Sequence, residues 1–296
     1  MSRQQLEALH ALIRARPPHT ASIAERRTAW EALAARFPVP PDVMIEVVDA
    51  DGVPGLFVSP PGVAKDRVLL FFHGGAFTLG SSRSYRELVG RMARAAGVRG
   101  LVIDYRLTPE HPFPAGLEDC IAAYEWLLHQ GIPAKNIALA GDSAGGNLLV
   151  ATLLALRDKG VALPACGVCI SGWYDLTNGS ESLRPEVSRD VFVPMKLIET
   201  APLAYLNGAD ASNPLASPLL GDLSGLPPLL IHVGEPELLI DDARRLAEKV
   251  RASGGVAELE IWPDMPHIWH FFGQMLDEGL EATDKAGRFI KRHVGG

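Results

Sequence analysis

The strongest constraint on this chain is an alternation of short apolar runs with helical stretches from residue 67 onward. Strands are predicted at 67–75, 100–106, 136–141, 166–171, 228–234 and 257–262, and helices at 84–97, 116–131, 144–160, 241–254 and 272–294. Nearly continuous apolar strands between helices are typical of a mostly parallel sheet with helices on both faces. The predicted fold class is therefore α/β.

Two regions depart from this alternation. Helices are expected around 3–16 and 23–36, followed by a hairpin over 44–60 with Asp51-Gly52 near its turn. Between Trp173 and Pro227 the pattern offers one short helix, near Pro194–Leu206, and much loop. An insertion that long in a compact fold is usually a lid or part of a binding surface.

Composition excludes several classes of protein. The chain of 296 residues is 47% hydrophobic and 21% charged, as in a soluble globular protein with one large core. A net charge of −7 without runs of like charge gives no reason to expect nucleic acid or an anionic membrane as partner. No segment approaches a transmembrane length, and the N-terminus predicts an amphipathic helix, not a signal peptide.

The three cysteines do not suggest a redox or metal site. Three cysteines cannot form a complete disulfide framework, so a cytoplasmic location is expected. Cys166 and Cys169 lie in one predicted strand, where residues three apart point to opposite faces. We therefore interpret both as core residues.

Ser143 is the candidate nucleophile. It lies in Gly-Asp-Ser-Ala-Gly-Gly, directly after a predicted strand and before a predicted helix. Gly141 and Gly145 allow the close approach of backbone that a tight strand-to-helix turn requires, and the helix N-terminus favours a developing anion. A glycine-rich turn with a serine cap is the simpler alternative, but the strand and helix around the motif favour a nucleophile.

A serine nucleophile needs hydrogen-bond donors for the oxyanion of the intermediate. His73-Gly74-Gly75-Ala76 lies at the end of the strand, after its core at 68–72, and its glycines leave backbone N–H groups unshielded. The N–H groups of Gly74, Gly75 and Ala144 are the predicted donors. His73 is expected to orient this loop and is also a candidate substrate-binding residue.

The base and the acid are sought after the later strands. His267 follows the last strand, past a proline-rich loop, and is preferred as base over nearby His270. Candidate acids after the strand at 228–234 are Glu235, Glu237, Asp241 and Asp242. The two aspartates open a helix, where carboxylates cap, so Glu237 in the loop is preferred. The order Ser143, Glu237, His267 is that expected of an α/β-hydrolase.

Apolar residues near this edge are candidates for an acyl pocket or, equally, for packing between insertion and core. They are Trp173, Tyr174, Phe192, Met195 and Leu197.

Four motifs together resemble the hormone-sensitive-lipase-like family of α/β-hydrolase carboxylesterases. They are HGGAF at 73–77, DYRLTPEHPFPA at 104–115, GDSAGGN at 141–147 and PDMPH at 263–267. The resemblance covers nearly the whole chain. It implies an eight-stranded, mostly parallel sheet forming one domain over 1–296, with a helical cap from 1–40 and 180–210.

The same resemblance implies hydrolysis of short- to medium-chain acyl esters without a cofactor or metal. Many family members carry Asp in an Asp-Pro-Leu segment where this chain has Glu237, although a branch uses Glu; Asp241 is the alternative acid. Within DYRLTPEHPFPA, Arg106 and Glu110 are predicted to form a structural ion pair.

Two other functions remain open from the sequence. An amidase or formamidase can use the same motifs, since the fold and the triad do not fix which bond is cut. A small-molecule receptor built on an inactive hydrolase would be expected to lack the base, which is present here. A homodimer is also predicted, through the strand at 257–262 if it lies at a sheet edge.

Activity is predicted to rise with pH through roughly pH 6–7, because His267 must be neutral to act as the base.

Overall fold

The computed structural model describes residues 3–18, 20–184 and 189–295. Its centre is an eight-stranded sheet in the order β1-β2-β4-β3-β5-β6-β7-β8, antiparallel for the β1–β2 and β2–β4 pairs and parallel for the others. The strands are β1 Met44–Asp49, β2 Pro54–Ser59, β3 Ala64–Phe72, β4 Val98–Ile103, β5 Ile137–Asp142, β6 Cys166–Ile170, β7 Leu229–Gly234 and β8 Ala257–Trp262. The predicted α/β class, hairpin and mostly parallel sheet are confirmed.

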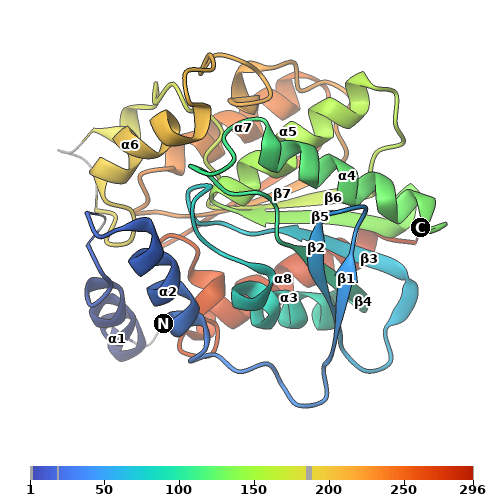
Figure 1. The fold of residues 1–296 in the computed structure, drawn as a ribbon, viewed down its shortest axis with the longest axis horizontal. Coiled ribbons are helices and arrows are strands. Elements are labelled where there is room, and N and C mark those ends of the chain that lie inside the picture. The colour runs from blue at the N-terminus through green and yellow to red at the C-terminus, as the bar shows by residue number, and fades with distance from the viewer. Residues whose placement is uncertain (1–2, 19, 185–188, 296) are drawn as a thin grey trace.

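Helices cover both faces of this sheet. α4, α5 and α7 lie on one face, and α3 and α8 lie on the other (Figure 1). The helices are α1 Arg3–Arg14, α2 Ile23–Ala34, α3 Ser82–Ala96, α4 Ala115–His129, α5 Ala144–Asp158, α6 Met195–Leu206, α7 Ile240–Ala252 and α8 Asp277–His293. The short helix predicted inside the insertion is α6.

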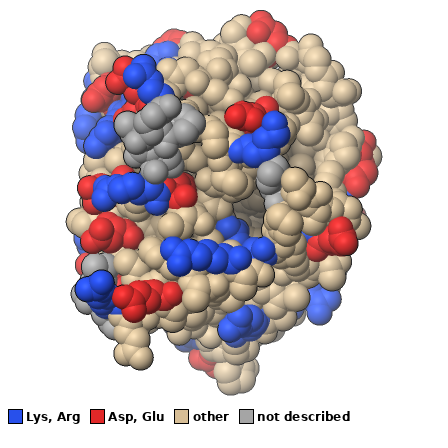
Figure 2. Space-filling model, turned by 90° about the vertical axis from the view of Figure 1, so that its left-hand side faces the viewer, with Lys and Arg blue, Asp and Glu red and all other residues tan. Residues whose placement is uncertain are grey.

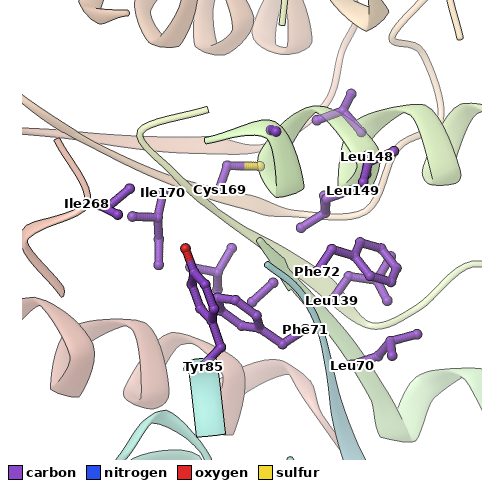
Figure 3. Close-up of a cluster of buried hydrophobic side chains, with 14 of the residues drawn as sticks. Leu70, Phe71, Phe72, Tyr85, Leu139, Leu148, Leu149, Cys169, Ile170 and Ile268 are labelled. Carbon is purple, nitrogen blue, oxygen red and sulfur yellow. The ribbon is translucent and has the colours of Figure 1, made fainter. Parts of the chain in front are cut away.

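The central strands are buried on both faces because helices pack on each side. Figure 3 shows side chains of β3 and β5 against α5 on one face, with Tyr85 of α3 on the other. Leu70, Phe71, Leu139 and Leu149 have no exposed surface. Cys166 and Cys169 of β6 are buried too, and burial raises the pKa of both thiols to about 12. Their interpretation as core residues is confirmed.

The N-terminal helices α1 and α2 lie at the same end of the molecule as α6 (Figure 1). Arg27 of α2 donates two hydrogen bonds to the Glu110 carboxylate, at 2.7 and 2.8 Å, and one to the Thr78 carbonyl at 2.8 Å. Arg16, just after α1, donates to the Phe192 carbonyl of the insertion at 2.7 Å. These bonds join segments that are far apart in the chain.

The predicted ion pair between Arg106 and Glu110 is wrong. The Arg106 side chain binds Asp119, with Nε 2.9 Å from Oδ2, and lies 3.1 Å from Glu118. Glu110 is held by Arg27 instead. The prediction relied on the nearness of Glu110 to Arg106 in sequence. Helix α4 brings the carboxylates of Glu118 and Asp119 back to Arg106, while Glu110 faces α2.

Candidate active site

Ser143 lies at the sharp turn between β5 and α5. Its backbone has φ +53° and ψ −118°, which is strained for a residue with a side chain. A Cβ at Gly141 would collide with the Gly145 carbonyl, and a Cβ at Gly145 would collide with the Phe72 carbonyl. Both glycines are therefore needed for this turn, which leaves the Ser143 side chain only partly buried.

His267 and Glu237 are in direct contact. His267 Nδ1 lies 2.7 Å from Glu237 Oε2, and both side chains are buried. Burial opposes protonation of His267, but the Glu237 charge and hydrogen bond outweigh it, so the pKa of His267 is raised. Burial likewise raises the pKa of Glu237, against the opposing effect of His267.

The second oxygen of Glu237 is held by other groups. Oε1 accepts hydrogen bonds from the Gly234 N–H at 2.6 Å and from the Ser171 hydroxyl at 2.7 Å. Ser171 Oγ also accepts from the Ile268 N–H at 3.1 Å. Ser171 therefore connects the loop of Glu237 with the loop of His267, and it was not among the predicted site residues.

The other candidate acids and the other candidate base are bound to groups outside the contact of His267 with Glu237. Asp242 accepts from Tyr174 N–H, Asp175 N–H and Ser180, and Asp241 accepts from Ser182 N–H and Arg244. Glu235 pairs with Arg189. His270 Nε2 lies 2.9 Å from His232 Nδ1 in the interior, where burial holds the pKa of His270 well below its usual value.

In the loop after β3, the backbone N–H groups that are free to bind an oxyanion differ from those predicted. The Gly74 N–H donates to Asp142 Oδ1 at 2.7 Å, so it is already occupied, which corrects its predicted role as an oxyanion donor. Gly75 has φ +120° and Ala76 has φ +52°, and both line the same cavity as Ser143. Asp142 also accepts from the Tyr85 hydroxyl at 2.8 Å, and burial raises its pKa to about 7.

His73 lies behind this loop. It has no exposed surface, and its ring stacks on Tyr105 with centroids 4.3 Å apart. Its Nδ1 lies 2.8 Å from the Gly74 carbonyl, and Tyr105 donates to the His73 carbonyl at 2.7 Å. These contacts fit the expectation that His73 orients the loop. They do not fit its second predicted role, because His73 does not line the cavity.

A cavity of about 400 Å³ opens in front of Ser143 and His267. Three predicted pocket residues line it, namely Trp173, Phe192 and Leu197. Two do not: Tyr174 is buried with its hydroxyl beside Cys169, and Met195 packs against the core. The cavity also receives residues that were not predicted, from α1 and α2 and from the loops after α1 and before α6, among them Arg16, Arg26, Trp30 and Asp190.

The sequence profile of a family described as alpha/beta hydrolase fold matches residues 69–271. The chain belongs to this family. It is 46% identical over 235 residues to an acetyl-hydrolase of Streptomyces hygroscopicus, covering 79% of each chain. It is 32% identical over 264 residues to an esterase of Acinetobacter venetianus, covering 89% of this chain and 87% of the relative.

A solved structure shows the same similarity along the full length. The crystal structure of an esterase from the bacterial hormone-sensitive lipase family matches with a TM-score of 0.96 and 42% identity, covering 100% of both chains. Together these relatives identify the chain as a carboxylic ester hydrolase of the hormone-sensitive-lipase-like group. None of the described helices is long and apolar enough to cross a membrane.

Proposed function

We propose that this enzyme is a serine carboxylesterase that hydrolyses short- to medium-chain acyl esters through Ser143, His267 and Glu237. The observation that carries the proposal is the 2.7 Å contact between His267 Nδ1 and Glu237 Oε2, beside a cavity that Ser143 and His267 share. A buried carboxylate at Nδ1 leaves Nε2 of the same imidazole as the proton acceptor.

The proposed reaction has two acyl transfers. Ser143 Oγ attacks the ester carbonyl carbon while His267 takes the hydroxyl proton. The tetrahedral intermediate collapses, the bond to the alcohol oxygen breaks, and His267 returns the proton to the leaving alcohol. A water then attacks the acyl-serine with His267 again as base, which releases the carboxylic acid and restores Ser143.

The oxyanion would be held by backbone N–H groups at the start of α5 and in the loop after β3. Ala144 supplies the first, at the N-terminus of the helix. Gly75 stays a proposed donor and Ala76 takes the place of Gly74, since both line the cavity and neither N–H donates a hydrogen bond to any of the described residues. Asp142 would fix this loop through Gly74.

The segments 1–40 and 180–210 are proposed as a cap on a single hydrolase domain spanning 1–296. Trp30 of α2, Leu197 of α6 and Phe192 before α6 line the cavity together, which supports this role. Residues 1–2, 19 and 185–188 of these segments lie outside the described residues. The cavity is mostly apolar where Trp173, Phe192 and Leu197 meet, which suits an acyl chain.

The test is hydrolysis of a p-nitrophenyl series from acetate to palmitate by the wild type and by Ser143→Ala. We expect a maximum at short to medium chains that disappears in the folded variant. Ester turnover that persists in Ser143→Ala would overturn the assignment of the nucleophile. Faster cleavage of matched anilides than of the esters would favour the amidase alternative.

A homodimer stays a prediction. β8 lies at one edge of the sheet, as a strand that pairs across a two-fold axis must. Sedimentation of the purified chain over a concentration series would decide between monomer and dimer.

A further inference from the structure

We propose that Arg26, together with Arg16, forms an anion subsite in the active-site cavity and that the enzyme prefers esters bearing a free carboxylate remote from the scissile bond. This inference rests on the proposed function, since it names the substrate class of the same cavity. It concerns two side chains for which the proposed mechanism has no use.

Arg26 faces the cavity without an anionic partner. Its side chain lines the cavity and is half-buried, yet it makes no hydrogen bond or ion pair with any of the described residues. Burial lowers the pKa of Arg26, because the guanidinium has lost part of its water. The next residue, Arg27, shows the contrast: it is held by the Glu110 carboxylate and by two backbone carbonyls. Arg27 fixes α2, which leaves Arg26 presented to the cavity.

Arg16 brings a second guanidinium to the same space. Its carbon Cζ lies 3.8 Å from the centroid of the Phe192 ring, and that ring lies 5.5 Å from the ring of His267. One aromatic ring therefore links Arg16 to the catalytic histidine. Arg16 uses Nε and Nη2 to bind the carbonyls of Ile13 and Phe192, at 3.1 and 2.7 Å. A guanidinium has five N–H donors, so others remain for a ligand.

The two guanidinium groups repel each other. Burial lowers the pKa of Arg16, the Asp190 charge opposes this and the Arg26 charge adds to it, so that the pKa lies at about 10. Asp190 also lines the cavity, but its carboxylate accepts from three backbone N–H groups, those of Phe192, Val193 and Leu238. The cavity thus holds two cationic side chains and one carboxylate already engaged, and an anionic ligand would relieve the excess charge.

Charge and shape favour a carboxylate as this ligand. This side of the molecule is hollowed, and Lys and Arg side chains border the hollow (Figure 2). A guanidinium presents a planar fork that matches a carboxylate, and the apolar lining suits the short carbon chain that would join it to the ester. The acyl or the alcohol part could carry the carboxylate, and the two arrangements are separable by substrate choice.

The experiment compares charged and neutral esters of equal length. For the acyl side, monoethyl glutarate and monoethyl adipate are compared with ethyl pentanoate and ethyl hexanoate. For the alcohol side, 4-acetoxybutyrate is compared with butyl acetate. Acid release is followed by pH-stat, and kcat/KM is measured for each pair. We expect the wild type to favour the charged member of at least one pair by about tenfold, as a single charge-assisted contact allows.

Three variants locate the effect. Arg26→Gln should abolish the preference while leaving kcat/KM for the neutral esters within about twofold, and Arg26→Lys should keep part of it. Arg36→Gln is the matched control, since Arg36 is an exposed arginine just beyond α2 and outside the cavity. It removes the same charge and should leave the preference intact.

The outcomes separate this inference from the proposed function. Turnover of neutral esters with no preference for charged ones in the wild type would overturn the anion subsite and leave the esterase mechanism standing. Equal losses on charged and neutral esters in Arg26→Gln would also overturn it, because the arginine would then act on the fold of the cap. Failure of the wild type to hydrolyse any ester, charged or neutral, would instead overturn the proposed function.

Discussion

The Ser171 hydroxyl donates to Glu237 Oε1 at 2.7 Å, while His267 Nδ1 contacts the other oxygen of the same carboxylate at 2.7 Å. Ser171 lies directly after β6 with φ +48°, a conformation that residues with a side chain adopt at a cost. The carboxylate is thus clamped between a fixed donor and the base. This arrangement predicts that Ser171 positions the acid without contacting substrate.

Replacing Ser171 tests that role with two variants. Ser171→Ala removes the hydroxyl and keeps the strained backbone, while Ser171→Gly removes the hydroxyl and relieves the strain. We expect both to lower kcat about tenfold with little change in KM, and Ser171→Gly to be the more stable in urea unfolding. A wild-type kcat in either variant, or a loss confined to KM, would contradict the positioning role.

The acid is decided by a pair of neutral substitutions. Glu237→Gln should lower kcat by about 10³–10⁴, because the amide cannot stabilise the imidazolium and can hold the wrong tautomer of His267. Asp241→Asn is the matched control. Asp241 is bound to the Ser182 N–H and to Arg244 on α7, so its variant should keep near-wild-type kcat. The reverse order of effects would move the acid to Asp241.

The pH profile follows from the contact between His267 and Glu237. Burial opposes protonation of His267, but Glu237 outweighs it, so the pKa of His267 lies above 6.5. The base must be neutral, so activity falls about tenfold for each pH unit below this pKa and rises as the pH passes through it. The rise of kcat/KM with pH should therefore have its midpoint above 6.5, the pKa of an unperturbed histidine.

Rates with p-nitrophenyl butyrate between about pH 5 and 9 would locate that limb. His232 and His270 should not contribute, because burial lowers the pKa of His232 to about 3 and that of His270 well below 6.5. In Glu237→Gln the midpoint should move to lower pH, since the charge that raises the pKa of His267 is gone. A rate independent of pH down to about 5 would exclude His267 as the base.

The sequence predicted those parts of the site that depend on strand ends. Ser143, Glu237 and His267 each follow a strand, and the carboxyl ends of parallel strands meet at one edge, so their proximity follows from the order of elements. Contacts made by side chains across the fold were not predictable in this way. Arg106 was assigned to Glu110 by nearness in sequence, whereas α4 brings Asp119 to it.

Ser171 and Arg26 were not predicted as site residues, and they differ in whether the sequence carried a signal for them. Ser171 carried a usable signal, since a polar residue directly after a strand lies at the same edge as Ser143. Arg26 carried none, because its place in the cavity depends on how α2 packs against α3 and on which face of the helix its neighbour Arg27 anchors. Helical periodicity specifies a buried face but not the element that the opposite face meets.

Asp142 offers the most direct test of how the loop after β3 is held. Its carboxylate accepts from the Gly74 N–H and from the Tyr85 hydroxyl, both buried. Asp142→Ala leaves both donors without a partner, at a cost of about 1–3 kcal/mol each in the free energy of unfolding. It should also lower kcat by 10- to 100-fold, because the N–H groups of Gly75 and Ala76 would lose their position.

Asp142→Asn separates geometry from charge. Its amide oxygen can still accept from Gly74, so most of the activity should remain.

Burial raises the pKa of Asp142 from 3.8 to about 7, so the folded state binds its proton more tightly than the unfolded state. This contribution to stability is fully present below 3.8 and is lost as the pH rises to about 7. Urea unfolding at about pH 5 and pH 8 should therefore show the wild type losing stability relative to Asp142→Asn at the higher pH. An equal difference at both values would mean that the Asp142 carboxyl is ionised throughout, held charged by its two donors.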